Sequence, residues 1–187
     1  MKHSEVRNPI IKTASSLFYK NGYNSTGINE IISEAGIAKA TLYNHFKSKE
    51  DICLAYLRFK DESFLTDIEA FTSSKPKGKS QVLALFGFLE LFFQTKDFNG
   101  CWCVKTVSEI QSSNEVIRDE IQKQKNALIQ FISKLVANNL EKIKSEEINS
   151  LSRKIYLMYE SAVSESHLHQ TDWPIKEAKN LCSKIID

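Results

Sequence analysis

One stretch near the start of the chain, residues 22 to 52, constrains the fold more than any other. It contains apolar residues at i, i+3, i+4 and i+7, the spacing of one face of a helix. These residues are Ile28, Ile31, Ile32 and Ala35. Gly36 follows at once, and glycine commonly ends a helix because it adopts positive φ without a Cβ clash. The pattern predicts a short helix over about 28–35 with a tight turn after it.

A second short helix is predicted over about 39–46, directly after the turn. Leu42 and Phe46 lie four residues apart and therefore share its inner face, while polar residues fill most other positions. Ser48 and Asp51 resemble a capping box, which predicts the start of a third helix. Helix, glycine turn and polar helix form the helix-turn-helix pattern, whose second helix lies in the major groove of DNA.

The same stretch resembles the DNA-binding signature of the TetR (tetracycline-repressor-like) family of bacterial transcriptional regulators. The matching residues are Gly22, Tyr23, Thr26, Ile28, Ile31, Ala35, Gly36, Ile37, Thr41, Leu42, Tyr43, Phe46, Lys49 and Ile52. The resemblance implies an all-helical homodimer that binds a double-stranded DNA operator through three N-terminal helices. A larger C-terminal domain would bind a ligand and the second subunit. Two positions depart from the pattern, because members often have Ser or Thr at Gly27 and Ser at Ala38, where each side chain would cap a helix.

We therefore expect an all-α protein of about nine helices in two domains. A three-helix, helix-turn-helix DNA-binding domain would span residues 1–48, and a helical ligand-binding and dimerisation domain would span residues 49–187. Six glycines and three prolines in the chain argue against a β-rich architecture. Besides the two short helices, periodicity predicts helices over about 9–21, with Pro9 in the first turn, 49–71, 81–96, 101–110, 115–140, 145–167 and from 174 onward.

The outward residues of the second short helix are the candidates for DNA contact. Base edges would be read by Lys39, Thr41 and Asn44, since lysine and asparagine pair with guanine and adenine edges respectively. Phosphate contacts are expected from Tyr43, His45, Lys47 and Lys49, and Thr26 completes the DNA-contact candidates. Tyr43 has an alternative interpretation as a structural aromatic residue.

The distribution of charge agrees with a DNA-binding head. Residues 1–60 contain nine Lys and Arg against five Asp and Glu, whereas residues 61–187 contain sixteen against eighteen. No signal peptide is visible at the start of the sequence. The longest apolar stretch, residues 82–93, contains Glu90 and is too short to span a bilayer, so we expect no membrane association and a cytoplasmic protein.

The C-terminal part offers aromatic residues that could line a pocket for a small apolar or aromatic effector. The candidates are Phe86, Phe92, Trp102, Phe131, Tyr156 and Tyr159, and each is also open to interpretation as ordinary core. The resemblance further implies that the two C-terminal helices of each subunit form the homodimer interface. Ligand binding that relieves repression is the expected response, with activation left open.

Two other interpretations remain open at this stage. Cys101 and Cys103, separated by one tryptophan, could sense thiol oxidation or a soft metal, although no further ligand with recognisable spacing accompanies them. Cys53 and Cys182 are expected to be core residues. A helical enzyme is the more distant alternative, because no phosphate loop, zinc motif or nucleophile elbow is present. We therefore expect no enzymatic activity, no catalytic residues, no resident metal and no cofactor.

Overall fold

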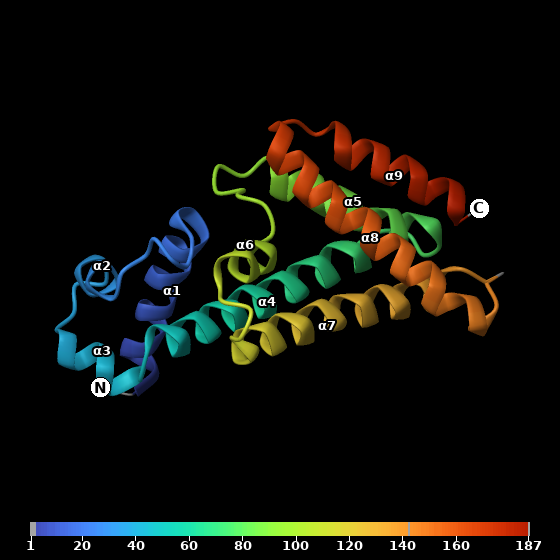
Figure 1. Cartoon of the computed structure of the whole chain (residues 1–187). Coiled ribbons are helices and arrows are strands. Elements are labelled where there is room, and N and C mark those ends of the chain that lie inside the picture. Colours follow the sequence, from blue (N-terminus) through green and yellow to red (C-terminus); the bar gives the residue numbers. More distant parts are fainter. Residues whose placement is uncertain (1–2, 142, 187) are drawn as a thin grey trace. The chain divides into compact units, whose positions relative to one another are not determined.

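The computed structural model describes residues 3–141 and 143–186, and these residues form nine α-helices joined by turns (Figure 1). The helices are α1 (His3–Asn21), α2 (Ile28–Glu34), α3 (Lys39–His45), α4 (Lys49–Ser73), α5 (Lys79–Phe93), α6 (Trp102–Glu109), α7 (Glu115–Asn139), α8 (Ser145–His169) and α9 (Trp173–Ile185). The predicted all-α class is confirmed, and most predicted helix ends lie within two or three residues of the observed ones.

The chain divides into two compact units, which we call the head unit and the body unit. The head unit comprises residues 1–63 and 102–123, and the body unit comprises residues 64–101 and 124–187. The division falls inside α4 and α7, so each of these helices contributes residues to both units. The predicted functional boundary between residues 48 and 49 concerns DNA and ligand binding and stays a prediction.

The first helix differs from the prediction at its start. It begins at His3, so Pro9 lies inside the helix rather than in its first turn. Proline lacks an N–H, so Pro9 cannot donate the i→i−4 hydrogen bond that is usual inside a helix. The first helix nevertheless buries the predicted stripe, which includes Ile10, Ala14 and Phe18. Burial of this apolar stripe stabilises the helix by more than the internal proline destabilises it.

The body unit has its core among α5, α8 and α9. Helix α5 packs against both α8 and α9, and these two helices also pack side by side (Figure 1). The buried side chains include Leu85, Phe86 and Leu89 from α5. Helix α5 is apolar nearly all round, as the sequence predicted for a central helix. Among the described residues, no helix is long and apolar enough to cross a membrane.

The turn after α1 depends on a glycine. Gly22 is buried with φ of +92°, and its N–H donates to the carbonyl of Phe18 at 3.0 Å. A Cβ at this position would collide with the carboxylate of Glu109 from α6. The positive φ therefore favours glycine, and a Cβ would in addition force the Glu109 carboxylate away from its hydrogen bond to the N–H of Asn24.

We expect Gly22→Ala to lower the free energy of unfolding by about 1–3 kcal/mol, because positive φ and the collision with Glu109 act together. Urea denaturation measures this change. Gly87→Ala is the matched control, since Gly87 lies within α5 and an added Cβ would meet Phe71 at an ordinary 3.5 Å. The control should be neutral or stabilised by up to about 1 kcal/mol. Equal effects of the two changes would contradict this account of the turn.

Candidate nucleic-acid interface

The turn between α2 and α3 is closed by two backbone hydrogen bonds. Gly36 has φ of +62°, and its N–H donates to Ser33 at 3.1 Å. The N–H of Ile37 donates to the carbonyl of Ile32 at 3.2 Å. This pair of bonds is the Schellman arrangement that ends a helix with a left-handed residue. The predicted glycine turn is therefore present, and it fixes the direction in which the chain enters α3.

Helix α3 is anchored by the two predicted apolar residues. Leu42 and Phe46 are fully buried, together with Ile31 of α2. The guanidinium of Arg7 lies 4.7 Å from the centre of the Phe46 ring, a favourable cation–π contact from α1. The inner face of α3 is thus held by residues of α1 and α2.

The opposite face of α3 carries most of the predicted DNA contacts. Lys39, Tyr43, Asn44 and Lys47 are exposed, and the exposed fraction of Tyr43 is 47%. Thr41 and His45 are half-buried. No carboxylate lies between Lys39 and Lys49, which suits a surface that faces phosphates. A tyrosine that is about half exposed fits a phosphate contact and also a structural aromatic at the edge of the core, so both interpretations of Tyr43 stay predictions.

One predicted DNA contact is wrong. Thr26 has no exposed surface, and its hydroxyl donates to the carbonyl of Gly22 at 2.8 Å. This hydroxyl satisfies a backbone carbonyl in the turn before α2, so it is not available to phosphate. Its match to the signature reflects a structural role.

Lys49 is partly withdrawn from the surface. Its ammonium lies 4.5 Å from the centre of the Tyr23 ring and donates to the carbonyl of Asn24 at 3.4 Å. Partial burial lowers the pKa of Lys49 despite the nearby carboxylate of Glu109. The predicted contact between Lys49 and a DNA phosphate stays a prediction. Such a contact would compete with the contacts that Lys49 makes within the protein.

The helix starts of the motif are unequally capped. Gly27 and Ala38 begin α2 and α3 without a side-chain cap, although the N–H of Gly27 donates to Glu30 at 3.2 Å. The predicted cap of α4 is present, because Ser48 accepts from the N–H of Asp51 at 3.1 Å. Asp51 in turn accepts from the N–H of Lys47 at 3.1 Å.

A contact from α6 supports the motif from outside it. The carboxylate of Glu109 accepts from the N–H of Asn24 at 2.6 Å, and the Asn24 amide donates to the carbonyl of Glu109 at 2.7 Å. Lys105 of the same helix donates to the carbonyl of Tyr19 at 2.8 Å. The end of α1 and the turn before α2 are therefore tied to α6. Spacing arguments did not give Glu109 this role, because its partner lies 85 residues earlier in the chain.

The six aromatic pocket candidates do not gather at a single site among the described residues. Trp102 belongs to the head unit, and the other five candidates belong to the body unit. The structure brings Phe86 and Tyr159 together, with ring centres 6.1 Å apart. Phe92 instead packs edge-on against Phe98 at 5.4 Å. The assignment of an effector pocket to these residues stays a prediction.

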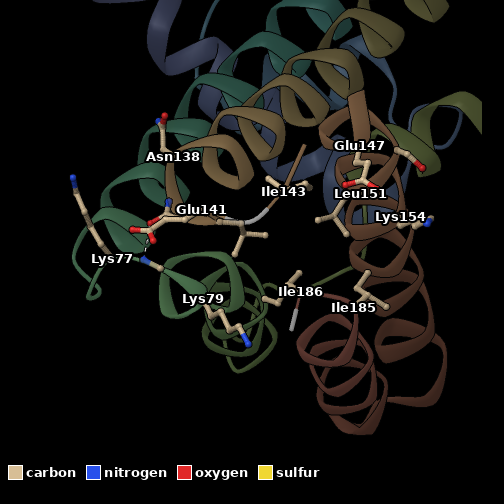
Figure 2. A pocket seen from close by; sticks show the side chains of 14 residues that line it. Lys77, Lys79, Asn138, Glu141, Ile143, Glu147, Leu151, Lys154, Ile185 and Ile186 are labelled. Carbon is tan, nitrogen blue, oxygen red and sulfur yellow. Dashed lines mark hydrogen bonds between the residues drawn. The ribbon is translucent and has the colours of Figure 1, made fainter. Parts of the chain in front are cut away.

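A described cavity of the body unit has a different lining. Its volume is about 860 Å³, and it lies among the start of α5, the end of α7, the first half of α8 and the end of α9. Figure 2 shows Ile143, Leu151, Ile185 and Ile186 around the open space, whereas Lys77 points away from it. None of the aromatic candidates lines this cavity.

The four cysteines are free thiols and all are buried. Burial raises the pKa of Cys53 and of Cys182 to about 12, as expected for unreactive core thiols. Cys101 differs because the ammonium of Lys125 donates to its sulfur at 3.1 Å. Among the described residues, no group of three or more His, Cys, Asp or Glu side chains is arranged to hold a metal ion.

Comparison with known proteins identifies the family of the motif. The model of the family "Bacterial regulatory proteins, tetR family" matches residues 10–56, which include α2, the turn and α3. This segment of the chain belongs to the TetR family. Its described fold is also that of solved TetR-family structures. The regulator SCO4454 of Streptomyces coelicolor superposes with a TM-score of 0.87 at 23% identity, covering 98% of this chain and 95% of that chain.

Curated relatives share this family at low identity. The chain is 26% identical to the transcriptional repressor NemR of Escherichia coli over 75% of this chain and 72% of that protein. It is 26% identical to the regulator QacR of Staphylococcus aureus over 96% of this chain and 79% of that protein. The match to the activator FasR of Mycolicibacterium smegmatis is 30% identical but spans only 48% of this chain and 43% of that protein. As a TetR-family chain, the protein is a DNA-binding transcriptional regulator rather than an enzyme.

Proposed function

We propose that this TetR-family chain is a homodimeric repressor that leaves its operator when a small apolar or aromatic effector binds. The observation that supports it most directly is the two-sided character of α3. Its apolar residues Leu42 and Phe46 are buried, while Lys39, Tyr43 and Asn44 are exposed on the other side. A short helix held by its inner face alone leaves its outer face free to enter a major groove.

Within that groove we assign two kinds of contact. Lys39, Thr41 and Asn44 would read base edges, and Tyr43, His45, Lys47 and Lys49 would bind phosphates. Lys47 is the better test of a phosphate contact than Lys49, because Lys47 is exposed whereas Lys49 contacts Tyr23 and Asn24. A regulator that binds bacterial DNA works where the DNA lies, so we expect this chain in the cytoplasm.

The proposed dimer interface lies on α8 and α9. Exposed apolar side chains gather on these two helices: Leu157, Leu168, Trp173, Leu181 and Ile185. On α8 the exposed residues Leu157, Ser161, Ser164 and Leu168 recur at i, i+4, i+7 and i+11, which is one continuous face. This face of leucines and small serines on α8, together with the exposed apolar residues of α9, supports a four-helix interface with a second copy of the chain.

The repressive direction of the proposal follows the relative that shares much of the chain. NemR is named a repressor and matches over 75% of this chain, whereas FasR, named an activator, matches over only 48% of it. Effector binding would lower operator affinity by the difference in binding energy between two conformations, and by no more than that difference.

A thiol-sensing regulator is the second candidate, and one contact favours it. The ammonium of Lys125 lies 3.1 Å from the sulfur of Cys101, and a neighbouring cation favours a reactive thiolate. Burial of Cys101 and Cys103 opposes reaction with a bulky oxidant. A thiol-sensing regulator would bind DNA in the same way as the effector-binding repressor, and only the signal that it detects would differ.

For DNA contact, we expect Lys47→Ala to weaken binding to operator and to random DNA alike. It should also flatten the dependence of log K on log salt by about one unit, because one phosphate contact is lost. Asn44→Ala should keep that slope and relax discrimination at one base pair. Fluorescence anisotropy at several salt concentrations measures both changes. An Asn44→Ala variant with unaltered sequence preference would refute the assignment of Asn44 as a reader.

For the interface, we expect the chain to be a dimer and Leu157→Glu to make it monomeric, because a charge would be buried without a partner. The exposed fraction of Leu157 is 64% in the single chain. Leu91→Glu is the matched control, since Leu91 is also an exposed body-unit leucine, at 51%, but lies on α5. Size-exclusion chromatography with light scattering gives the mass of each. A monomeric wild type, or a dimeric Leu157→Glu, would contradict the proposed interface.

For the signal, hydrogen peroxide should leave operator affinity unchanged in the wild type if the effector is a small apolar molecule. If the thiols sense oxidation, peroxide should weaken operator binding by the wild type. The Cys101→Ser, Cys103→Ser double variant should then be insensitive. Measurement of operator affinity before and after peroxide, and again after reduction with dithiothreitol, separates the two candidates.

A further inference from the structure

The hydroxyl of Tyr159 is a buried polar group of the body unit that the described part of the fold leaves unexplained. Tyr159 lies on α8 with an exposed fraction of 2%, and its hydroxyl has no hydrogen-bond partner among the described residues. A buried hydroxyl without a partner is destabilising, and native proteins rarely retain one without a reason. Phenylalanine would fill the same space without this loss. The hydroxyl therefore calls for a partner that the fold itself does not supply.

The ring of Tyr159 lies in apolar surroundings. Its centre is 6.1 Å from that of Phe86 and 6.5 Å from that of Phe64, both in tilted arrangements. Phe64 in turn packs edge-on against Phe88 at 5.8 Å. A molecule that reaches the Tyr159 hydroxyl would therefore meet aromatic side chains, and these favour an apolar or aromatic skeleton.

The charges beside this tyrosine already have partners. Lys125 forms an ion pair with Glu160 at 2.7 Å and donates to the sulfur of Cys101 at 3.1 Å. Burial, followed by the charge of Glu160, raises the pKa of Tyr159, so the phenol keeps its proton. The group thus acts as an O–H donor. Because the neighbouring ammonium and carboxylate compensate each other, a charged ligand would gain little at this position and would lose its hydration.

We propose that the Tyr159 hydroxyl anchors the effector, and that the effector is a neutral, largely apolar molecule with a carbonyl-type oxygen acceptor. This inference rests on the proposed ligand-responsive function and specifies its ligand class. The hydroxyl donates to the carbonyl oxygen, and the phenylalanines near the ring contact the apolar part. Neither anionic nor cationic amphiphiles belong to this class.

A matched pair of probes tests the ligand class. 2-Acetylnaphthalene and 2-ethylnaphthalene have similar shapes, but only the ketone has an oxygen acceptor. We expect the wild-type protein to bind the ketone roughly ten-fold more tightly than the hydrocarbon, because one buried hydrogen bond is gained. Isothermal titration calorimetry measures both affinities. Equal affinities, or failure of the wild type to bind the ketone, would overturn the proposal.

Tyr159→Phe tests the residue. In this variant the preference for the ketone should vanish, while the hydrocarbon should bind as before. Ser152→Ala removes another buried hydroxyl from the same helix, one that donates to the carbonyl of Ile148, and should keep the preference. If Ser152→Ala abolishes it instead, the assignment to Tyr159 is wrong. The Tm of Tyr159→Phe without any probe should equal or exceed that of the wild type. A clear fall in Tm would show that the hydroxyl has an internal partner, which also overturns the proposal.

Operator binding separates failure of this inference from failure of the proposed function. Tyr159→Phe should bind the operator as the wild type does, since the residue lies in the body unit rather than on α3. An effector unrelated to carbonyl compounds could release the wild type and Tyr159→Phe equally from the operator. That result would support the ligand-responsive function and contradict the role of Tyr159. If neither protein binds a specific operator, the proposed function itself fails.

Discussion

The burial of Leu42 and Phe46 is the interaction on which the DNA-binding surface depends. Helix α3 has seven residues and no side-chain cap at its start, so its own hydrogen bonds are too few to keep it folded. It persists because these two side chains are buried beside Ile31 and beneath Arg7. The same burial fixes the rotation of the helix about its axis. Between the two anchors, Tyr43 and Asn44 are then exposed, whereas His45 is half-buried.

The orientation of this surface also depends on residues far along the chain. Glu109 binds the turn that precedes α2, and Asn114 donates to Glu50 near the start of α4 at 2.7 Å. Both partners lie at or beside α6, which follows Cys101 directly in the chain. Within the head unit, the position of the turn before α2 and of the start of α4 therefore depends on α6 and on the residues that follow it, and not on α2 and α3 alone.

Most of this fold could be predicted from local periodicity in the sequence. The features that could not be predicted share one physical cause. The helices, the Gly36 turn and the Ser48 cap follow from residues within a few positions of one another. Thr26, Lys49 and Glu109 could not be assigned in this way. The burial of Thr26 and the contacts of Lys49 and Glu109 arise from how the chain folds back at Gly22 and Asn24. A signature match marks such positions as important without separating DNA contact from support of the turn.

For the aromatic residues of the body unit, too, the sequence does not separate a structural role from a ligand-binding role. In sequence, Phe86 and Tyr159 are equivalent candidates for core or pocket, and both are buried. What separates them is the unpaired hydroxyl, which becomes visible when every neighbour has been placed. Because Lys125 and Glu160 already neutralise each other, ligand binding there would change hydrogen bonding rather than local charge. The signal would then have to be a conformational preference, since a hydrogen bond acts only over contact distance. The ligand would therefore act by a change of conformation and not by a long-range change of the electrostatic field.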